Sequence, residues 1–323
     1  MGAVAPHAQV APSEAENKRT ITQKIMFDQI FDLSLFREIA DWRVLCYILL
    51  ALVILFIAKL INGKLSDYEL NHELTENDNK AIAISFSGFL IALCIVISGV
   101  LFSPSSVDSM DEAASPFLQD IKMTLIWSAV GVSLLLISRL LCDKLMLPSF
   151  SNKVELVRDR NVGVGFVQAG AYVSTALVLK ASLSSPVDLP LLEDIGLTAI
   201  WFIVSQILII LYSIAYQKTT KHDIHQELKN DNAAVGVALA GNIIAFGILL
   251  SFFIAVYDSI LGLIIWAVLS MVMLGLVRFA VDKLILPGHS LSTELSKDRN
   301  WGAGAIEAVT AIGAALIITG AFH

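Results

Sequence analysis

Residues 282–304 read DKLILPGHSLSTELSKDRNWGAG, and residues 143–165 read DKLMLPSFSNKVELVRDRNVGVG, at a constant offset of 139 positions. A second block recurs upstream at offsets of 154 and 153, where Glu73-Leu74 and Asp78-Asn79 match Glu227-Leu228 and Asp231-Asn232. Self-similarity at a fixed spacing is the signature of a duplicated structural unit. The sequence therefore predicts two copies of one unit, at 43–182 and 190–323, behind an N-terminal segment, 1–42.

Composition indicates that most of the chain meets lipid. Hydrophobic residues make up 56% of the sequence, charged residues only 16%, and the mean hydropathy is +0.74. Soluble domains carry about 25% charged residues. Eight apolar stretches are long enough to span a bilayer: roughly 44–61, 81–102, 123–142, 162–180, 195–216, 233–256, 259–281 and 301–321. Backbone polar groups must be paired inside lipid, so the prediction is an all-α polytopic membrane helical bundle of eight transmembrane helices.

The distribution of charge in the loops predicts the orientation. Lysine and arginine are concentrated in the loops after spans one, three, five and seven, whereas the other connections are mainly acidic. The positive-inside rule places the basic loops in the cytoplasm and both termini in the periplasm. The N-terminal segment is itself basic and favours the opposite orientation, but seven later connections outweigh it. With four spans in each unit, the two repeats are predicted to be parallel.

The N-terminal segment has a character of its own. Residues 1–17 lack the basic start and apolar run of a secretory signal. Residues 25–42 alternate apolar and acidic side chains in a helical pattern. We expect an amphipathic helix that lies on the membrane surface, or a cap that packs on the bundle.

Asp–Asn and Asp–Arg–Asn motifs precede the second and fourth spans of both repeats. Asparagine and aspartate are favoured N-caps of helices, and neighbouring basic side chains can reach lipid headgroups. Capping and orientation therefore account for these motifs without a ligand. The repeated cytoplasmic-side residues in the fourth-span motif are Asp159, Arg160, Asp298 and Arg299.

Two arginine–aspartate pairs near the cytoplasmic ends of spans three and seven are less easily explained by architecture alone. Arg139 and Asp143, like Arg278 and Asp282, are four residues apart and share a helix face. An aspartate near a helix C-terminus is unfavourable. We expect compensation from the adjacent lysine, from a neighbouring helix N-terminus or from a bound cation. A structural ion-pair network is the preferred interpretation.

The fourth span of each repeat carries a polar stripe. Asn300, Gly304 and Glu307 fall on one face of span eight, and Glu307 lies about 10 Å inside the membrane at 1.5 Å per residue. A carboxyl group at this depth is a functional-site hypothesis by default. The alternative is a structural Glu307 that is protonated, or that is hydrogen-bonded to Gln206 or Asn242. The predicted polar path consists of Glu307, Asn300, Asn242, Gln206, Gln168 and Asn161.

Several classes of site and function find no support in the sequence. The chain has no P-loop, dinucleotide fingerprint, His-Glu-x-x-His helix or Gly-x-Ser-x-Gly elbow, so we do not expect an enzyme. Cys46, Cys94 and Cys142 have no disulfide or zinc spacing. His222 and His225 are spaced like metal ligands, but the first repeat has Tyr68 and Asn71 there. We therefore predict no metal and no cofactor. A net charge of −7 argues against nucleic-acid binding.

These motifs resemble the YjfL-like family of bacterial inner-membrane proteins, which carry the domain of unknown function DUF350. The resemblance rests on Asp78-Asn79-x-Ala81 with Asp231-Asn232-Ala233, and on residues 159–165 with 298–304. It covers both repeats, so the chain resembles two tandem copies fused, and it does not cover the first 42 residues. It implies an inner-membrane location and genomic company with membrane-stress proteins, but no established activity. Single-repeat relatives would be expected to pair, as a homo-oligomer that this fusion mimics.

Two function classes remain open. The first is permeation of cations or small cationic solutes along the polar path between the repeats. The second is a non-transporting scaffold whose cytoplasmic loops recruit membrane-stress partners. The faces that carry Gly88 and Ala92, or Gly241 and Ala245, serve either the seam between repeats or a contact between chains.

Overall fold

The computed structural model describes residues 41–66, 68–102, 116–183, 189–257 and 259–322, and every regular element within these ranges is a helix. The chain forms two compact units, residues 1–50 and 51–323. The first unit contributes only the beginning of α3 (Trp42–Leu65) to the described structure. The expected surface helix at 25–42 lies outside the described residues, apart from its last two positions. The second unit holds the rest of α3 and all the other described helices, and therefore most of both repeats.

Among the described residues, eight helices are long and apolar enough to cross a membrane, in agreement with the predicted spans. Their bounds are α3, α5 (Lys80–Phe102), α6 (Pro116–Leu141), α8 (Val162–Leu183), α9 (Leu191–Thr219), α11 (Ala233–Val256), α12 (Ile260–Ala280) and α14 (Trp301–Ala321). Two π-helical turns, η1 (Cys142–Met146) and η2 (Val281–Ile285), extend α6 and α12 up to the residue before Leu147-Pro148 and Leu286-Pro287. The prediction of an all-α polytopic bundle is confirmed.

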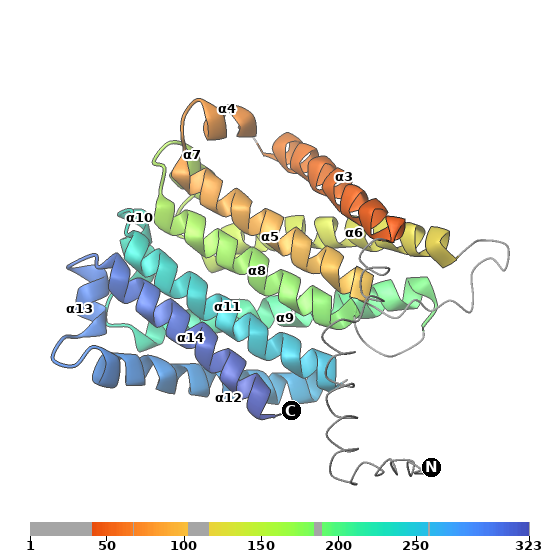
Figure 1. The fold of residues 1–323 in the computed structure, drawn as a ribbon. Coiled ribbons are helices and arrows are strands. Elements are labelled where there is room, and N and C mark those ends of the chain that lie inside the picture. The colour runs from red at the N-terminus through yellow and green to blue at the C-terminus, as the bar shows by residue number, and fades with distance from the viewer. Residues whose placement is uncertain (1–40, 67, 103–115, 184–188, 258, 323) are drawn as a thin grey trace, which may run out of the picture. The chain divides into compact units, whose positions relative to one another are not determined.

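Four short helices show that the repeating unit is smaller than the predicted one. They are α4 (Leu70–Thr75), α7 (Asn152–Val157), α10 (Ile224–Lys229) and α13 (Leu291–Ser296). Each contains a Glu-Leu pair, and each joins a long helix to the next one along the chain. The fold therefore consists of four hairpins of the same direction, two in each parallel repeat. All four short helices lie at one end of the bundle, here called the short-helix end (Figure 1).

An asparagine caps the second helix of every hairpin. The side-chain Oδ1 atoms accept hydrogen bonds from backbone amides of the first helical turn, at distances of 3.1–3.4 Å. The residue before each asparagine has a positive φ, between 46° and 56°. Non-glycine residues seldom adopt this conformation, so the same turn has been kept four times. The predicted capping role is confirmed for Asn79, Asn161, Asn232 and Asn300.

The four capped helices, α5, α8, α11 and α14, lie side by side in that order and form what we call the inner row (Figure 1). Small residues allow their backbones to approach closely. A methyl group on Gly88 would overlap Ala169, and one on Gly241 would overlap Ala308. Both contacts lie inside a repeat, so these two glycines serve neither of the predicted roles, the seam between repeats or a contact between chains. Helices α6, α9 and α12 pack against the inner row.

The capping asparagines also link each hairpin to the next. The Nδ2 atom of Asn79 donates to the carbonyl oxygen of Leu156 at 2.9 Å, and that of Asn232 donates to Leu295 at 2.8 Å. Between the two repeats, Asn161 donates to the carbonyl oxygen of Leu228. Each acceptor is the leucine of the Glu-Leu pair in the following hairpin. One kind of contact thus occurs three times, within repeats and between them.

Replacing Asn161 with alanine is expected to cost more stability than replacing Asn300. Both changes remove a cap, which costs about 1 kcal/mol. Asn161 is fully buried and also bonds to Leu228 and Glu155, whereas the exposed Asn300 bonds only to Glu294 beyond its own helix. Unpaired buried groups add about 1–3 kcal/mol for Asn161→Ala. Free energies of unfolding in mixed micelles measure the difference, and equal losses would contradict a linking role for Asn161.

Candidate functional site

The most polar buried group in the second repeat is centred on an ion pair between Arg278 and Glu307. Arg278 lies in the last turn of α12, and Glu307 lies in the second turn of α14. The Arg278 Nη1 atom donates to Glu307 Oε1. The Glu307 residue is 1% exposed, so water screens this pair very little. Such a pair is stable only where further hydrogen bonds compensate the loss of hydration.

Two tyrosines and an asparagine supply much of that compensation. The Tyr216 hydroxyl donates to Glu307 Oε1 at 2.8 Å and accepts from Arg278 Nη1 at 2.7 Å. The Asn242 Nδ2 atom also donates to Glu307 Oε1, at 3.2 Å, and Tyr212 donates to the Asn242 Oδ1 atom at 3.1 Å. The guanidinium carbon of Arg278 lies 4.9 Å from the Tyr216 ring centre, a cation–π distance. Helices α9, α11, α12 and α14 thus all contribute to one network.

The second carboxyl oxygen of Glu307 is different from the first. Within the part of the chain that the structure describes, Oε2 is buried and has no hydrogen-bond partner. A buried carboxylate oxygen without a partner is costly, and it is a place where a proton or a cation would be stabilised. Three donors therefore converge on Oε1 while Oε2 is left over.

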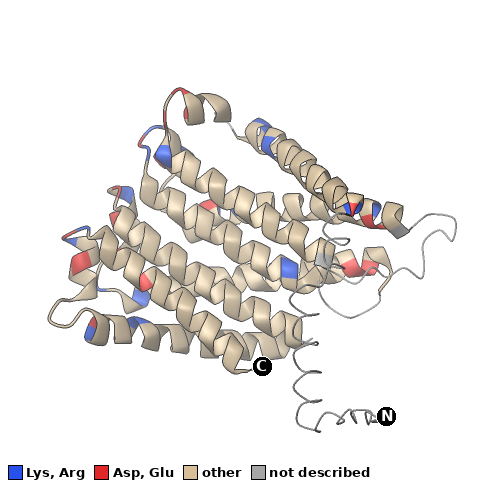
Figure 2. Cartoon of the chain, in the orientation of Figure 1, with Lys and Arg blue, Asp and Glu red and all other residues tan. Residues whose placement is uncertain are grey.

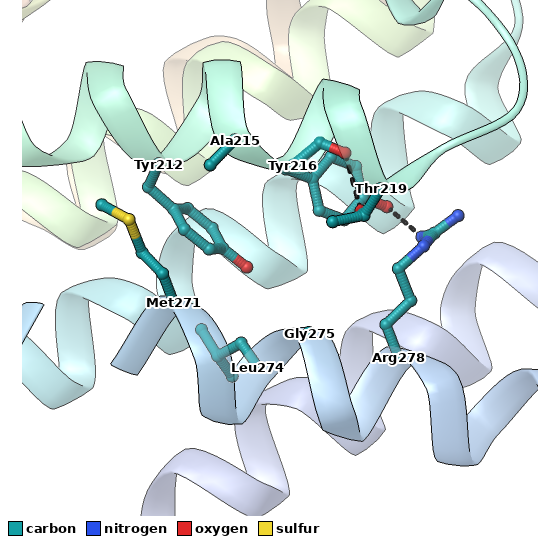
Figure 3. A pocket seen from close by; sticks show the side chains of 8 residues that line it. All are labelled: Tyr212, Ala215, Tyr216, Thr219, Met271, Leu274, Gly275 and Arg278. Atoms are coloured by element: carbon teal, nitrogen blue, oxygen red, sulfur yellow. Dashed lines mark hydrogen bonds between the residues drawn. The ribbon is translucent and has the colours of Figure 1, made fainter. Parts of the chain in front are cut away.

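A small cavity lies beside the network, between α9 and α12 (Figure 3). Its volume is about 30 Å³, enough for a water molecule. Arg278 and Tyr216 line one end of it and Tyr212 with Met271 the other. Gly275 contributes to the wall, and a methyl group there would meet nothing within 4 Å. Arg278 lines this cavity, and Glu307 does not.

The first repeat has the arginine but not the carboxylate. Arg139 donates to the Asn62 Oδ1 atom at 2.9 Å and to the Ser66 hydroxyl at 3.0 Å. At the offset of 154, Asn62 of the first repeat corresponds to Tyr216 of the second. At the offset of 139, Gln168 corresponds to Glu307. The Gln168 side chain bonds instead to Asp143 and Ser85. The two halves therefore share a frame, and the charge pair belongs to the second alone.

The expected partners of the two aspartates are partly found. Asp282 bonds to Lys283 at 2.9 Å and accepts from the Leu291 amide at the start of α13. Both were among the predicted compensating groups. Asp143 accepts instead from the side chains of Asn152, at 2.7 Å, and Gln168, at 2.9 Å. Among the described residues, the expected ion-pair network is therefore found only in part: Asp282 pairs with Lys283, whereas Asp143 is held by neutral amide side chains.

The residues of the predicted polar path fall into separate groups. Glu307 and Asn242 lie together, but Gln206 bonds to Thr175 and Ser138, in a buried cluster between the repeats. Gln168 lies with Asp143, while Asn161 and Asn300 are helix caps. The alternative partners foreseen for Glu307 were Asn242, which the structure shows, and Gln206, which it does not. Glu307 and Asn242, the residues of the predicted path that share a hydrogen bond, both lie in the second repeat.

The repeated charged motif at the short-helix end lies on the surface. Asp159 forms an exposed pair with Arg158 at 2.8 Å, and the hydrogen bond from that arginine lowers the pKa of Asp159. Arg299 donates to the carbonyl oxygen of Asn230 at 3.0 Å, whereas Arg160 and Asp298 are exposed. Figure 2 shows how charged residues gather at this end of the bundle. These contacts fit the predicted architectural role.

The histidine pair does not form a metal centre with a third ligand. Among the described residues, no three His, Cys, Asp or Glu side chains are close enough to hold a metal ion together. Burial is the main cause that lowers the pKa of His222, and the positive charge of Arg278 acts in the same direction.

Sequence reasoning missed the partner of Glu307. It grouped Arg278 with Asp282, four residues away on the same helix, and it did not consider Tyr212 and Tyr216. One signal was available: Arg278 and Glu307 both lie within predicted spans, toward the same end, and intramembrane charges pair with one another.

The fold and the buried ion pair define a multi-pass helical membrane protein with a charged group inside the bilayer. The chain belongs to the family described as Domain of Unknown Function (DUF350), whose model matches residues 33–183 and 190–322. The two matches confirm the resemblance to two tandem family domains. A curated relative, the UPF0719 transmembrane protein YshE of Bacillus subtilis (strain 168), is 24% identical over 120 residues, which are 37% of this chain and 88% of the relative. No solved structure matches the chain.

Proposed function

We propose that this chain conducts protons or small cations across the bacterial inner membrane, with Glu307 as the binding carboxylate. The observation that carries the proposal is the state of Glu307: fully buried, bonded through Oε1 and unpartnered at Oε2. Ionisable groups inside spans are expensive and mark ion pathways and proton relays. The path then runs through the second repeat, rather than through the seam between the repeats.

Arg278 acts in this proposal as a resident cation. When Arg278 occupies Oε1, the site is neutral and closed. A proton or a cation that binds to Glu307 Oε2 partly neutralises the carboxylate, and so weakens its attraction for Arg278. The Tyr216 ring and hydroxyl then retain the guanidinium, since both already contact it. Release of the ion on the other side restores the pair.

The direction of the path follows from the loops. We place the short-helix end in the cytoplasm and both termini in the periplasm, because basic residues predominate in the short-helix loops. Glu307 is six residues past Trp301, about 9 Å along the helix from this end. In this proposal, the cavity between α9 and α12, which has room for one water molecule, hydrates the arginine side of the network. The rest of the route, toward the periplasm, would have to open in another conformation.

Ion flux into liposomes that contain purified protein tests the proposal. Wild type is expected to conduct protons or small cations, and Glu307→Gln is expected to abolish flux because the carboxylate is lost. The variant Arg278→Met/Glu307→Gln leaves no unpaired charge and should be folded and equally silent. Glu294→Gln changes an interfacial carboxylate of the same helix pair, α13 and α14, and serves as the matched control that conducts like wild type. Flux that is unchanged in Glu307→Gln would refute the assigned role.

A scaffold without transport is the alternative, and the exposed charges of the short-helix end favour it (Figure 2). Cytoplasmic membrane-stress proteins are the proposed partners in that case, and no catalysis is involved in either proposal. Tight vesicles that contain folded wild-type protein, together with partner capture that is lost when exposed charges such as Arg158 or Lys297 are reversed, would favour the scaffold.

A further inference from the structure

The inner row has two free ends. In α8 and α11, each of which has two inner-row neighbours, 72% of the residues in the apolar window are buried. The share falls to 50% in α5 and 33% in α14, each of which has one such neighbour. Lipid can cover an apolar helix face, so exposure alone says little. We therefore compare the free faces of α14 and α5 with the contact between α8 and α11, here called the seam, for its small residues and its hydrogen bonds.

The free face of α14 corresponds to the face that α8 turns toward α11. Methyl groups on Gly163 and Gly170 would touch α11 or its cap, and Ser174 lies against Gly247. At the offset of 139, these positions are Gly302, Val309 and Gly313. A methyl group on Gly313 would meet nothing within 4 Å, and Val309 is 69% exposed. The α14 face is therefore built like the seam but has no neighbour among the described residues.

The free face of α5 corresponds to the face that α11 turns toward α8. There Gly236 lies against Gly163, Ala240 against Gly170 and Gly247 against Ser174. At the offset of 153, α5 carries Ala83, Ser87 and Cys94. Ser87 and Cys94 are exposed. Small side chains thus occupy the same places on α5 as on α11, and no described residue covers Ser87 or Cys94.

The hydrogen bonds at the short-helix end stop at the same two places. Three capping asparagines donate to the leucine of the following hairpin, but Asn300, in the last described hairpin, is exposed and makes no such bond within the described residues. Leu74, the first leucine of the series, receives no such bond from any asparagine in the described ranges. A donor is left at one end of the row and an acceptor position at the other.

We infer that a second copy of this chain places its α5 against α14, and so continues the inner row from one molecule to the next. The contact is head to tail: Asn300 of one molecule faces Leu74 of the other, and Gly313 faces Cys94. Val309 is larger than Gly170, so this contact is expected to be wider than the α8–α11 seam. The relative from Bacillus subtilis agrees with this view, since 120 residues are 88% of its length. It holds one repeat, and would need a second molecule to form such a seam.

Disulfide cross-linking in native membranes tests the contact. With Cys46 and Cys142 changed to alanine, Gly313→Cys is expected to form a disulfide with the native Cys94 of the adjacent molecule under mild oxidation. In the template seam, a Cβ built on Gly247 lies 2.9 Å from the Cβ of Ser174. A slightly wider contact reaches the separation of about 3.5–4.5 Å that a disulfide needs. Head-to-tail contacts give a ladder of dimers, trimers and longer products.

Three controls decide between the outcomes. Val272→Cys, 56% exposed on α12 and at a comparable depth, should give no ladder. Gly313→Cys combined with Cys94→Ala should lose it. Wild-type elution in size-exclusion chromatography checks that the variants fold.

The inference is overturned if folded Gly313→Cys stays monomeric, as it would with lipid on this face. Dimers that persist without Cys94 would also overturn it, because they would show a symmetric contact. Neither result depends on ion transport.

Discussion

Replacing Arg278 with methionine is expected to destabilise the folded protein by about 3–5 kcal/mol, because it leaves Glu307 buried and without its counter-charge. Tyr216 and Asn242 continue to donate to Glu307 Oε1, but neither neutralises it. Since Oε2 already lacks a partner, the variant has no spare donor to recruit. The free energy of unfolding in mixed micelles measures the loss.

The duplicated sequence supplies the matched control. Arg139→Met removes the equivalent arginine of the first repeat, which donates to the neutral side chains of Asn62 and Ser66. We expect a smaller loss there, about 1.5–3 kcal/mol. The double variant Arg278→Met/Glu307→Gln should return to within about 2 kcal/mol of wild type. A double variant as unstable as the sum of the single changes would show that the two residues are not energetically coupled.

Gly236→Leu is expected to prevent α8 and α11 from packing. A Cβ atom at Gly236 would overlap the Cα atom and the carbonyl group of Gly163, and backbone cannot move aside as a flexible side chain can. Overpacking costs about 1–3 kcal/mol and occasionally more. We expect the upper end or beyond, because three further side-chain atoms follow the Cβ. The yield of folded protein after size-exclusion chromatography, and its unfolding midpoint, measure the effect.

Gly196→Leu is the control for this change. Gly196 lies in α9, and a Cβ atom there would meet nothing within 4 Å. The same increase in volume and hydrophobicity should therefore leave stability nearly unchanged. If both variants fold equally well, the close contact between α8 and α11 is not what holds the repeats together.

The elements that the sequence predicted are those that the solvent or the local backbone determines. Lipid requires about 20 apolar residues in each span, so the eight spans could be located from composition alone. The capping role of Asn161 and Asn300 was also predictable, because a cap bonds to its own helix within three residues. Duplication and the even number of spans gave the parallel arrangement.

The contacts that the sequence did not predict depend on which helices become neighbours. Arg278 has Asp282 nearby in sequence but bonds to Glu307, from another helix. Gln206 and Asn242 both seemed able to reach Glu307, and only helix packing decides between them. The equivalence of all four hairpins was hidden because α4 and α7 share little beyond a Glu-Leu pair and a later asparagine. Their common geometry emerges only from the turn with positive φ.

The links between successive hairpins have a consequence for synthesis. Each joins residues 63–77 positions apart, so the acceptor leaves the ribosome well after its asparagine donor. In each linked hairpin, one N–H of the capping asparagine already bonds to a glutamate of the same hairpin, and the other N–H lacks its protein acceptor until the next hairpin is made. During synthesis we expect the three links to form in chain order, first from Asn79, then from Asn161 and last from Asn232. A chain that stops after the first, second or third hairpin therefore lacks the same single hydrogen bond at its last hairpin, so one change at the short-helix end distinguishes incomplete chains from complete ones.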